Sequence, residues 1–204
     1  MGWLDFVPRT SSPRLYIGGL YALYQTSLIE DAGITHVLSI INYDPLLQER
    51  FAHLKHLHIR AEDDPNEDLI KWFARANRFI EGAGQGGDSG GSGDGNESEN
   101  GKGAVFIHCA MGKSRSATFV VAYLMWKYKI SWEAALEQLC EGRPVCDPNV
   151  GFKEQLGVYE KVLAAMSEDE AKGIYEKWER ERFKGEWWEW DKRERGKKKE
   201  KASL

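Results

Sequence analysis

The sequence lacks the features that mark membrane-spanning and secreted proteins. No apolar run approaches the length of a membrane span, and Met1–Pro8 lacks the basic-then-apolar pattern of a secretory signal. Only three cysteines occur, Cys109, Cys140 and Cys146, which are too few and too scattered for a disulfide framework. The net charge of −4 argues neither for nor against nucleic acid, and no DNA partner is expected. These absences favour a reducing compartment, with the cytoplasm as the expected location.

The pattern along the chain predicts an α/β fold with a mostly parallel central sheet flanked by helices, because strands and helices alternate. The length of 204 residues suits one domain with appendages. Strands are predicted at Leu15–Gly19, His36–Ile41, Leu54–Arg60 and Ala104–His108. Helices are predicted at Ser27–Ala32, Glu67–Ile80, Ser114–Tyr128, Ser131–Cys140 and Asn149–Met166, with Ser131 and Asn149 as N-caps.

The domain predicted from these elements spans residues 13–166, after an N-terminal arm at residues 1–12. Residues 82–103 are almost free of apolar side chains and rich in Gly and Ser, which predicts a flexible insertion. A charged C-terminal tail, residues 167–204, contains Trp178, Trp187, Trp188 and Trp190 and ends in the basic stretch Lys192–Lys201. We expect its first half to be helical and its end to be disordered. Its tryptophans can dock a partner or the tail's own domain, and its basic end is a candidate nuclear-localisation or RNA-contacting segment.

The segment from His108 to Ser116 carries the chemistry. A strand leads in, a turn from Cys109 to Arg115 follows, and a helix leads out. Backbone N–H groups in such a turn can converge on one anion, and the helix directs its positive end there. We therefore predict that a phosphate is bound by the loop residues, namely Ala110, Met111, Gly112, Lys113, Ser114 and Arg115.

The same positive field acts on the sulfur of Cys109. Helix N-termini and nearby cations lower the pKa of a thiol from about 8.5, which produces a thiolate nucleophile at neutral pH. The planar guanidinium of Arg115 can hold two phosphate oxygens together. The plain alternative, a buried structural cysteine, leaves the surrounding glycine, arginine and serines unexplained. An ATP-binding loop is disfavoured because Ile107 stands where that motif requires glycine.

A cysteine nucleophile needs an acid that protonates the leaving oxygen. The acidic loop Ala61-Glu62-Asp63-Asp64-Pro65 follows the predicted strand at Leu54–Arg60. Loops at the carboxyl ends of parallel strands share one rim of the sheet, so this loop and the cysteine loop are expected to meet. From the residues alone, Asp63 and Asp64 are both candidates.

His108–Ser116 resembles the His-Cys-x-x-Gly-x-Ser-Arg-Ser signature of the dual-specificity protein phosphatases, within the protein tyrosine phosphatase superfamily. The resemblance implies that Cys109 forms a phosphocysteine intermediate, that Arg115 binds the phosphate and that Ser116 eases departure of the sulfur. It implies that His108 braces the loop and tunes the thiol. The acidic loop of the family aligns with Asp63 without a gap, which favours Asp63 as general acid and then general base. No cofactor or metal is implied.

Further residues resemble an atypical fungal subgroup linked to ribosome assembly, namely Gly18-Gly19-Leu20-Tyr21-Ala22-Leu23 and Tyr175-Glu176-Lys177-Trp178. Members of that subgroup usually carry a cysteine-rich zinc module after the phosphatase domain, and this sequence has no cysteine after Cys146. The implied function is hydrolysis of phosphotyrosine and phosphoserine/threonine in a phosphoprotein. The alternatives are a phosphate-binding scaffold on ribosomal particles, contacted through the tail, and a phosphatase for phosphoinositides or other non-protein phosphates. The basic Lys113 resembles the basic loop residue of lipid-phosphate phosphatases in the superfamily.

Two further groups of residues are candidate sites. His53, His56 and His58 have spacing that could suit a metal, but no Cys or carboxylate completes a zinc set, and partly exposed strand histidines are the preferred interpretation. Cys140 and Cys146 are candidates for a redox partner of Cys109, with small buried side chains as the simpler interpretation.

Overall fold

The computed structural model describes residues 3–44, 46, 50–85 and 103–202. Within these residues it forms one five-stranded sheet in the order β1-β2-β5-β3-β4. The strands are β1 Leu4–Phe6, β2 Arg14–Gly19, β3 Ile34–Ile40, β4 Lys55–Ile59 and β5 Ala104–Cys109. All neighbours pair in parallel except β1, which runs antiparallel to β2. The predicted mostly parallel sheet is confirmed.

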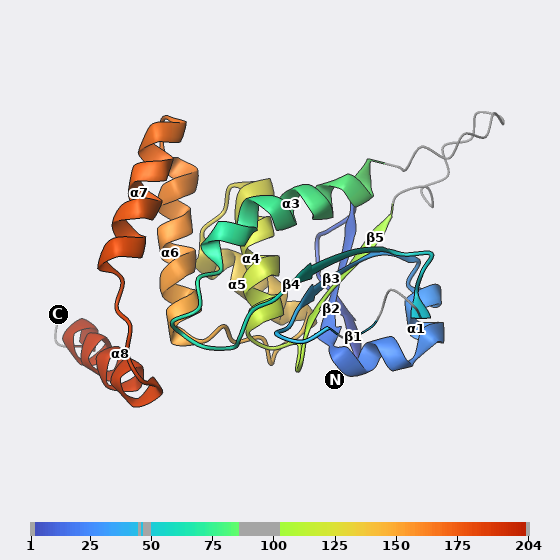
Figure 1. Ribbon diagram of the computed structural model, residues 1–204, viewed down its shortest axis with the longest axis horizontal. Helices are drawn as coiled ribbons and strands as arrows, with labels where there is room; N and C mark the ends of the chain where they lie inside the picture. Colours follow the sequence, from blue (N-terminus) through green and yellow to red (C-terminus); the bar gives the residue numbers. More distant parts are fainter. Residues whose placement is uncertain (1–2, 45, 47–49, 86–102, 203–204) are drawn as a thin grey trace.

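Helices flank this sheet on both faces (Figure 1). One face is covered by α3 Ile70–Gly84, α4 Arg115–Tyr128, α5 Trp132–Gly142 and α6 Val150–Ala164. The other face carries a 3-10 helix, η1 Leu20–Tyr24, and α1 Thr26–Asp31. Two more helices, α7 Glu168–Glu181 and α8 Trp187–Ala202, follow α6, and α7 lies beside α6 in Figure 1.

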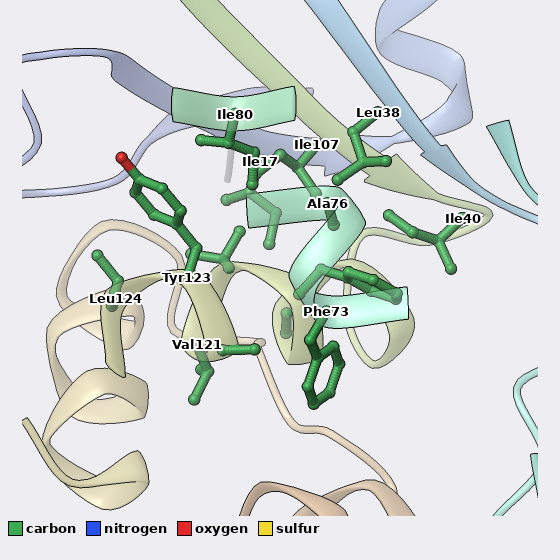
Figure 2. Close-up of a cluster of buried hydrophobic side chains, with 14 of the residues drawn as sticks. Ile17, Leu38, Ile40, Phe73, Ala76, Ile80, Ile107, Val121, Tyr123 and Leu124 are labelled. Carbon is green, nitrogen blue, oxygen red and sulfur yellow. The ribbon is translucent and has the colours of Figure 1, made fainter. Parts of the chain in front are cut away.

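The central strand β5 is buried along its whole length because both of its faces contribute to the core. Val105 and Ile107 lie in the larger cluster, between the sheet and helices α3 to α6, whereas Phe106 lies in the smaller cluster beneath η1 and α1. Figure 2 shows part of the larger cluster, in which Ile17, Leu38 and Ile107 come from the strands, and side chains such as Phe73 and Val121 come from α3 and α4. A fully buried side chain of this kind contributes roughly 1.5–3 kcal/mol, so the two clusters together hold β5 in the centre of the sheet.

The predicted helix starts at Ser131 and Asn149 are confirmed, since each side chain caps its helix. Ser131 accepts a hydrogen bond from Ala134 N, and Asn149 accepts one from Phe152 N. Two boundaries differ from expectation. The predicted N-terminal arm contains the strand β1. α3 begins at Ile70 instead of the predicted Glu67, and the residues before Ile70 form an irregular loop.

The C-terminal tail is helical in two pieces that pack back on the domain. α8 continues to Ala202, and disorder of the tail's end stays a prediction from the sequence. Most of the predicted flexible insertion at 82–103 lies outside the described residues, although α3 extends through Gly84. Among the described residues, no helix combines the length and the apolar character needed to cross a membrane.

Candidate active site

The loop between β5 and α4 is held tightly against the end of β2. Leu20 N donates to the carbonyl of Ala110 at 3.1 Å. Gly112 has a φ of 68°, and a Cβ at this position would lie 2.2 Å from the carbonyl carbon of Gly18. Only glycine fits both the left-handed backbone and the close approach. The loop can therefore curl around the end of β5 and turn its N–H groups inward.

Cys109 stands at the end of β5 with 1% of its surface exposed. Its Sγ accepts a hydrogen bond from Gly112 N at 3.2 Å and lies 3.3 Å from Ser116 Oγ. Burial is the largest single influence on its pKa and raises it. The hydroxyl and amide of Ser116, the amide of Lys113 and the charge of Arg115 act in the opposite direction, and together they hold the pKa of the Cys109 thiol below its ordinary value.

His108 is fully buried and joins the loop to the neighbouring strand. Its Nδ1 lies 3.2 Å from the carbonyl of Cys109, so Nδ1 must carry the donor proton, and Nε2 then accepts from Ser39 Oγ at 2.7 Å. The parallel register places Ser39 directly beside His108. Burial lowers the pKa of His108 to about 4, so the ring is neutral at physiological pH. A neutral ring in this position braces the carbonyl of Cys109.

Arg115 brings the cysteine loop and the acidic loop together. Its Nη1 donates to the carbonyl of Ala61 at 3.0 Å, and its Nε lies 3.9 Å from Asp63 Oδ2. The side chain is buried, and among the described residues its Nε has no hydrogen-bond partner. A buried guanidinium with a free donor at the loop is suited to an oxyanion ligand. The predicted meeting of the two loops at one rim is confirmed.

Asp63 and Asp64 have different surroundings, although they are adjacent in sequence. Asp63 Oδ1 accepts from Ser114 Oγ at 2.6 Å and from Asn149 Nδ2 at 3.0 Å, which directs the carboxylate toward the cysteine loop. Asp64 Oδ1 instead accepts from Asn66 N at 2.7 Å and closes a local turn. Of these two carboxylates, only that of Asp63 contacts residues of the cysteine loop among the described residues.

The other loop residues divide by exposure. Met111 and Lys113 point to solvent, with Met111 exposed at 74%, whereas Gly112 and Ser114 are buried. Ser114 Oγ also accepts from Asn149 N at 3.1 Å, so its hydroxyl connects the acidic loop to the start of α6. The side chain of Ser114 is thus occupied by protein contacts, which leaves its backbone for a ligand.

Arg143 is a site residue that the sequence pattern did not identify as one. Its Nε and Nη2 donate to the carbonyls of Gly112 and Met111 at 2.8 and 3.1 Å, and its Nη1 contacts Asp5 of β1. By binding carbonyls on the outer side of the loop, Arg143 keeps the loop amides turned toward Cys109. Because its loop partners lie 31 and 32 positions earlier in the chain, no local sequence pattern marks Arg143 as a site residue.

A cleft of about 630 Å³ opens beside Arg115. Its wall includes Asp63 and Ala110, and also Lys71 of α3 and Arg182 from the C-terminal tail. Several acidic side chains of the acidic loop line the remaining wall, among them Glu62 and Asp68. The tail thus reaches the candidate active site.

The remaining candidates stand apart from this cleft. The Nε2 atoms of His56 and His58 lie 2.9 and 2.8 Å from backbone carbonyls of Phe51 and Ile41, and both rings are half-buried, as preferred from the sequence. Burial raises the pKa of Cys146 to about 12, and its Sγ lies 3.9 Å from the carbonyl of Gly112. This thiol is therefore unreactive at neutral pH.

The catalytic domain of the dual specificity phosphatases matches residues 15–162, and the chain belongs to this family of cysteine-dependent protein phosphatase domains. Among curated proteins, MAP kinase phosphatase with leucine-rich repeats protein 2 of Dictyostelium discoideum is 33% identical over 79% of this chain. Tyrosine-protein phosphatase YVH1 of Saccharomyces cerevisiae is 33% identical over 72% of it.

Among solved structures, the Yvh1 phosphatase domain from Chaetomium thermophilum is similar with a TM-score of 0.65 and 34% identity. That match covers 76% of this chain and 94% of the other. The chain spans only 20% of the Dictyostelium relative and 42% of the Saccharomyces one. The family and the fold are thus shown for the domain, whereas the activity of the whole protein is a matter for proposal.

Proposed function

We propose that this chain is a dual-specificity protein phosphatase that hydrolyses phosphotyrosine and phosphoserine/threonine esters through a phosphocysteine intermediate. The observation that carries the proposal is the environment of the Cys109 sulfur. It receives the amide of Gly112, lies near the hydroxyl of Ser116 and stands beside buried Arg115, whose Nε has no partner among the described residues. These groups stabilise both a thiolate and a phosphate dianion.

In the first step the Cys109 thiolate attacks phosphorus, and a sulfur–phosphorus bond forms as the ester oxygen leaves. Asp63 gives its proton to that oxygen, which avoids an unprotonated leaving group. Both donors to Asp63 bind Oδ1, so the transferable proton belongs on Oδ2, the oxygen that faces Arg115. Arg115 and the loop amides hold the equatorial phosphate oxygens.

In the second step a water molecule attacks the phosphorus of the phosphocysteine. Asp63, now a carboxylate, takes a proton from that water, and the sulfur–phosphorus bond breaks to release inorganic phosphate. The electron pair returns to Cys109 Sγ. Ser116 Oγ, 3.3 Å away, can donate to the departing sulfur and stabilise it as thiolate.

Hydrolysis of a generic aryl phosphate by the wild type and by Cys109→Ser tests the proposal. We expect the serine variant to lose essentially all turnover, and equal rates would refute the enzyme. Asp63→Ala and Asp64→Ala form a matched pair for the acid, because Asp64 closes a local turn instead of contacting the cysteine loop. We expect a loss of about 10²–10⁴-fold for Asp63→Ala only. A loss confined to Asp64→Ala would move the acid role to that residue.

Lys113 is the residue that bears on whether the substrate is a phosphoprotein or a phosphorylated lipid. Its side chain is exposed on the loop, where it can face a bulky phosphorylated headgroup or solvent. A panel of phosphopeptides and phosphoinositides separates the two substrate classes. The scaffold role in ribosome assembly, and locations in the cytoplasm and nucleus, stay predictions from the sequence.

A further inference from the structure

The acidic loop continues beyond Pro65 to Leu69, and the C-terminal tail binds it chiefly at Asn66. Asn66 Oδ1 accepts hydrogen bonds from Gly185 N and Trp190 Nε1, both at 3.0 Å. Its Nδ2 donates to the carbonyl of Gly185 at 2.9 Å, and its own carbonyl accepts from Arg182 Nη1 at 2.7 Å. The side-chain amide of Asn66 thus makes two hydrogen bonds to Gly185, between α7 and α8, and one to Trp190 of α8.

This contact is firmly anchored on the tail side. Trp190 is 3% exposed and packs edge-on against Phe183, with ring centroids 4.9 Å apart. Arg193 stacks over both rings and forms an ion pair with Glu154 of α6 at 3.4 Å. A second contact joins α7 to the same loop, since Tyr175 donates to Asp68 Oδ2 at 2.8 Å. The tail is therefore attached to α6 and to the acidic loop together.

The rest of the acidic loop is held at its two ends. Asp63 at one end is fixed by Ser114 and Asn149. At the other end, Gln155 of α6 accepts from Leu69 N at 2.8 Å and donates to the carbonyl of Glu67 at 2.7 Å. Asn66 lies between these attachments, three positions after Asp63, and its side chain bonds only to the tail among the described residues.

We propose that the segment Arg182–Trp190 is a positioning element for the general acid, which holds the acidic loop through Asn66 so that Asp63 faces Arg115. This proposal rests on the function proposed above for Asp63. The residues that make the contact lie beyond residue 162, where the family match ends. The positioning element thus lies outside the stretch that matches the family domain. Small displacements of a catalytic group cost large factors in rate, so removing the contact should impair the acid step selectively.

The test compares two substrates in the full chain. Phenyl phosphate depends strongly on a protonated leaving oxygen, whereas p-nitrophenyl phosphate depends on it less because p-nitrophenol is the stronger acid. We expect Asn66→Ala to lower kcat/KM, which reports the step in which the ester oxygen leaves, at least about 10-fold more for phenyl phosphate than for p-nitrophenyl phosphate. Trp190→Phe, which keeps an aromatic ring but loses the indole donor, should shift the ratio in the same direction by a smaller factor. Trp188→Phe, on an exposed residue of the same helix, should match the wild type.

Alkylation of Cys109 separates positioning from general damage. We expect Asn66→Ala and Trp190→Phe to keep the wild-type alkylation rate, because the cysteine loop is built without the tail. The proposal is overturned if Asn66→Ala and Trp190→Phe leave the ratio of the two substrates' rates at its wild-type value, whether both rates fall equally or neither changes. Asp63→Ala calibrates the ratio. If it shows the selectivity and the tail variants do not, only the positioning role fails; if it shows none, the acid assignment fails and the positioning role with it.

Discussion

At the scale of single residues, the surroundings of Cys109 include influences that raise the pKa of its thiol and others that lower it. Burial raises the pKa of the thiol, and four weaker influences from Ser116, Lys113 and Arg115 outweigh it together. His108 next to it experiences burial without a compensating anion, so its pKa falls to about 4. One buried residue is thus poised to carry charge and its neighbour to stay neutral.

The neutral state of His108 makes stability depend on pH. The folded-state pKa of His108 is about 4, below the unfolded value of about 6.5. Between these two pH values the unfolded chain therefore binds a proton at His108, whereas the folded chain does not. Stability should therefore be full above about pH 6.5 and fall as the pH drops toward 4. Between about pH 7 and pH 5 the expected loss from this residue is roughly 2 kcal/mol.

Urea unfolding at these two pH values measures this loss. His36 has a pKa lowered to about 4 in the same way, so His108→Gln should reduce the pH dependence without abolishing it. His53→Gln, on an exposed histidine, is the control and should keep the full dependence. A His108→Gln protein with the wild-type difference between the two pH values would show that His108 is already charged in the folded state.

At the scale of elements, the cysteine loop depends on contacts that come from outside β5 and α4. At the end of β2, the backbone of Gly18 lies close to Gly112, and the adjacent Leu20 N donates to the carbonyl of Ala110. From the segment after α5, Arg143 donates hydrogen bonds to the loop carbonyls. The contact of Arg143 with Asp5 extends this support to β1. The short first strand thereby has a part in shaping the phosphate cradle.

Arg143→Met should test this support. The guanidinium is 7% exposed in its side chain, and its ion pair with Asp5 is largely buried, so its loss should cost roughly 3–5 kcal/mol of unfolding free energy. Arg9→Met is the matched control, because the Arg9–Glu141 pair is exposed and should contribute little. Urea unfolding gives the free energies, and alkylation of Cys109 should slow in Arg143→Met only. Equal stabilities for the two variants would exclude Arg143 as a support of the loop.

At the scale of the whole molecule, the sequence predicts those features whose cause lies nearby in the chain. The cysteine loop is an uninterrupted segment, and the capping side chains of Ser131 and Asn149 act three residues away. The meeting of Asp63 with the loop followed from the shared rim of two parallel strands. Arg143 and Asn66 were missed because their partners lie far along the chain, 138 residues away for Asp5 and 124 for Trp190.

The same reasoning explains the errors at the boundaries. β1 is only three residues long, and what makes it a strand is its pairing with β2. The backbone of Glu67–Leu69 looks helical in sequence, but Gln155, 86 positions after Leu69, binds it in an irregular form. Tertiary contacts thus overrode the local pattern in each case.

Ending the chain after Glu181 tests how far the tail belongs to the folded unit. This change removes buried Trp190 and the four hydrogen bonds to Asn66, and we expect a loss of roughly 2–5 kcal/mol of unfolding free energy. The two core clusters lie before this point, so the truncated chain should still unfold cooperatively in urea. Trp187→Ala, exposed at 71%, serves as the control and should be neutral. An unchanged urea midpoint after truncation would mean that the residues after Glu181 do not dock on the domain in solution.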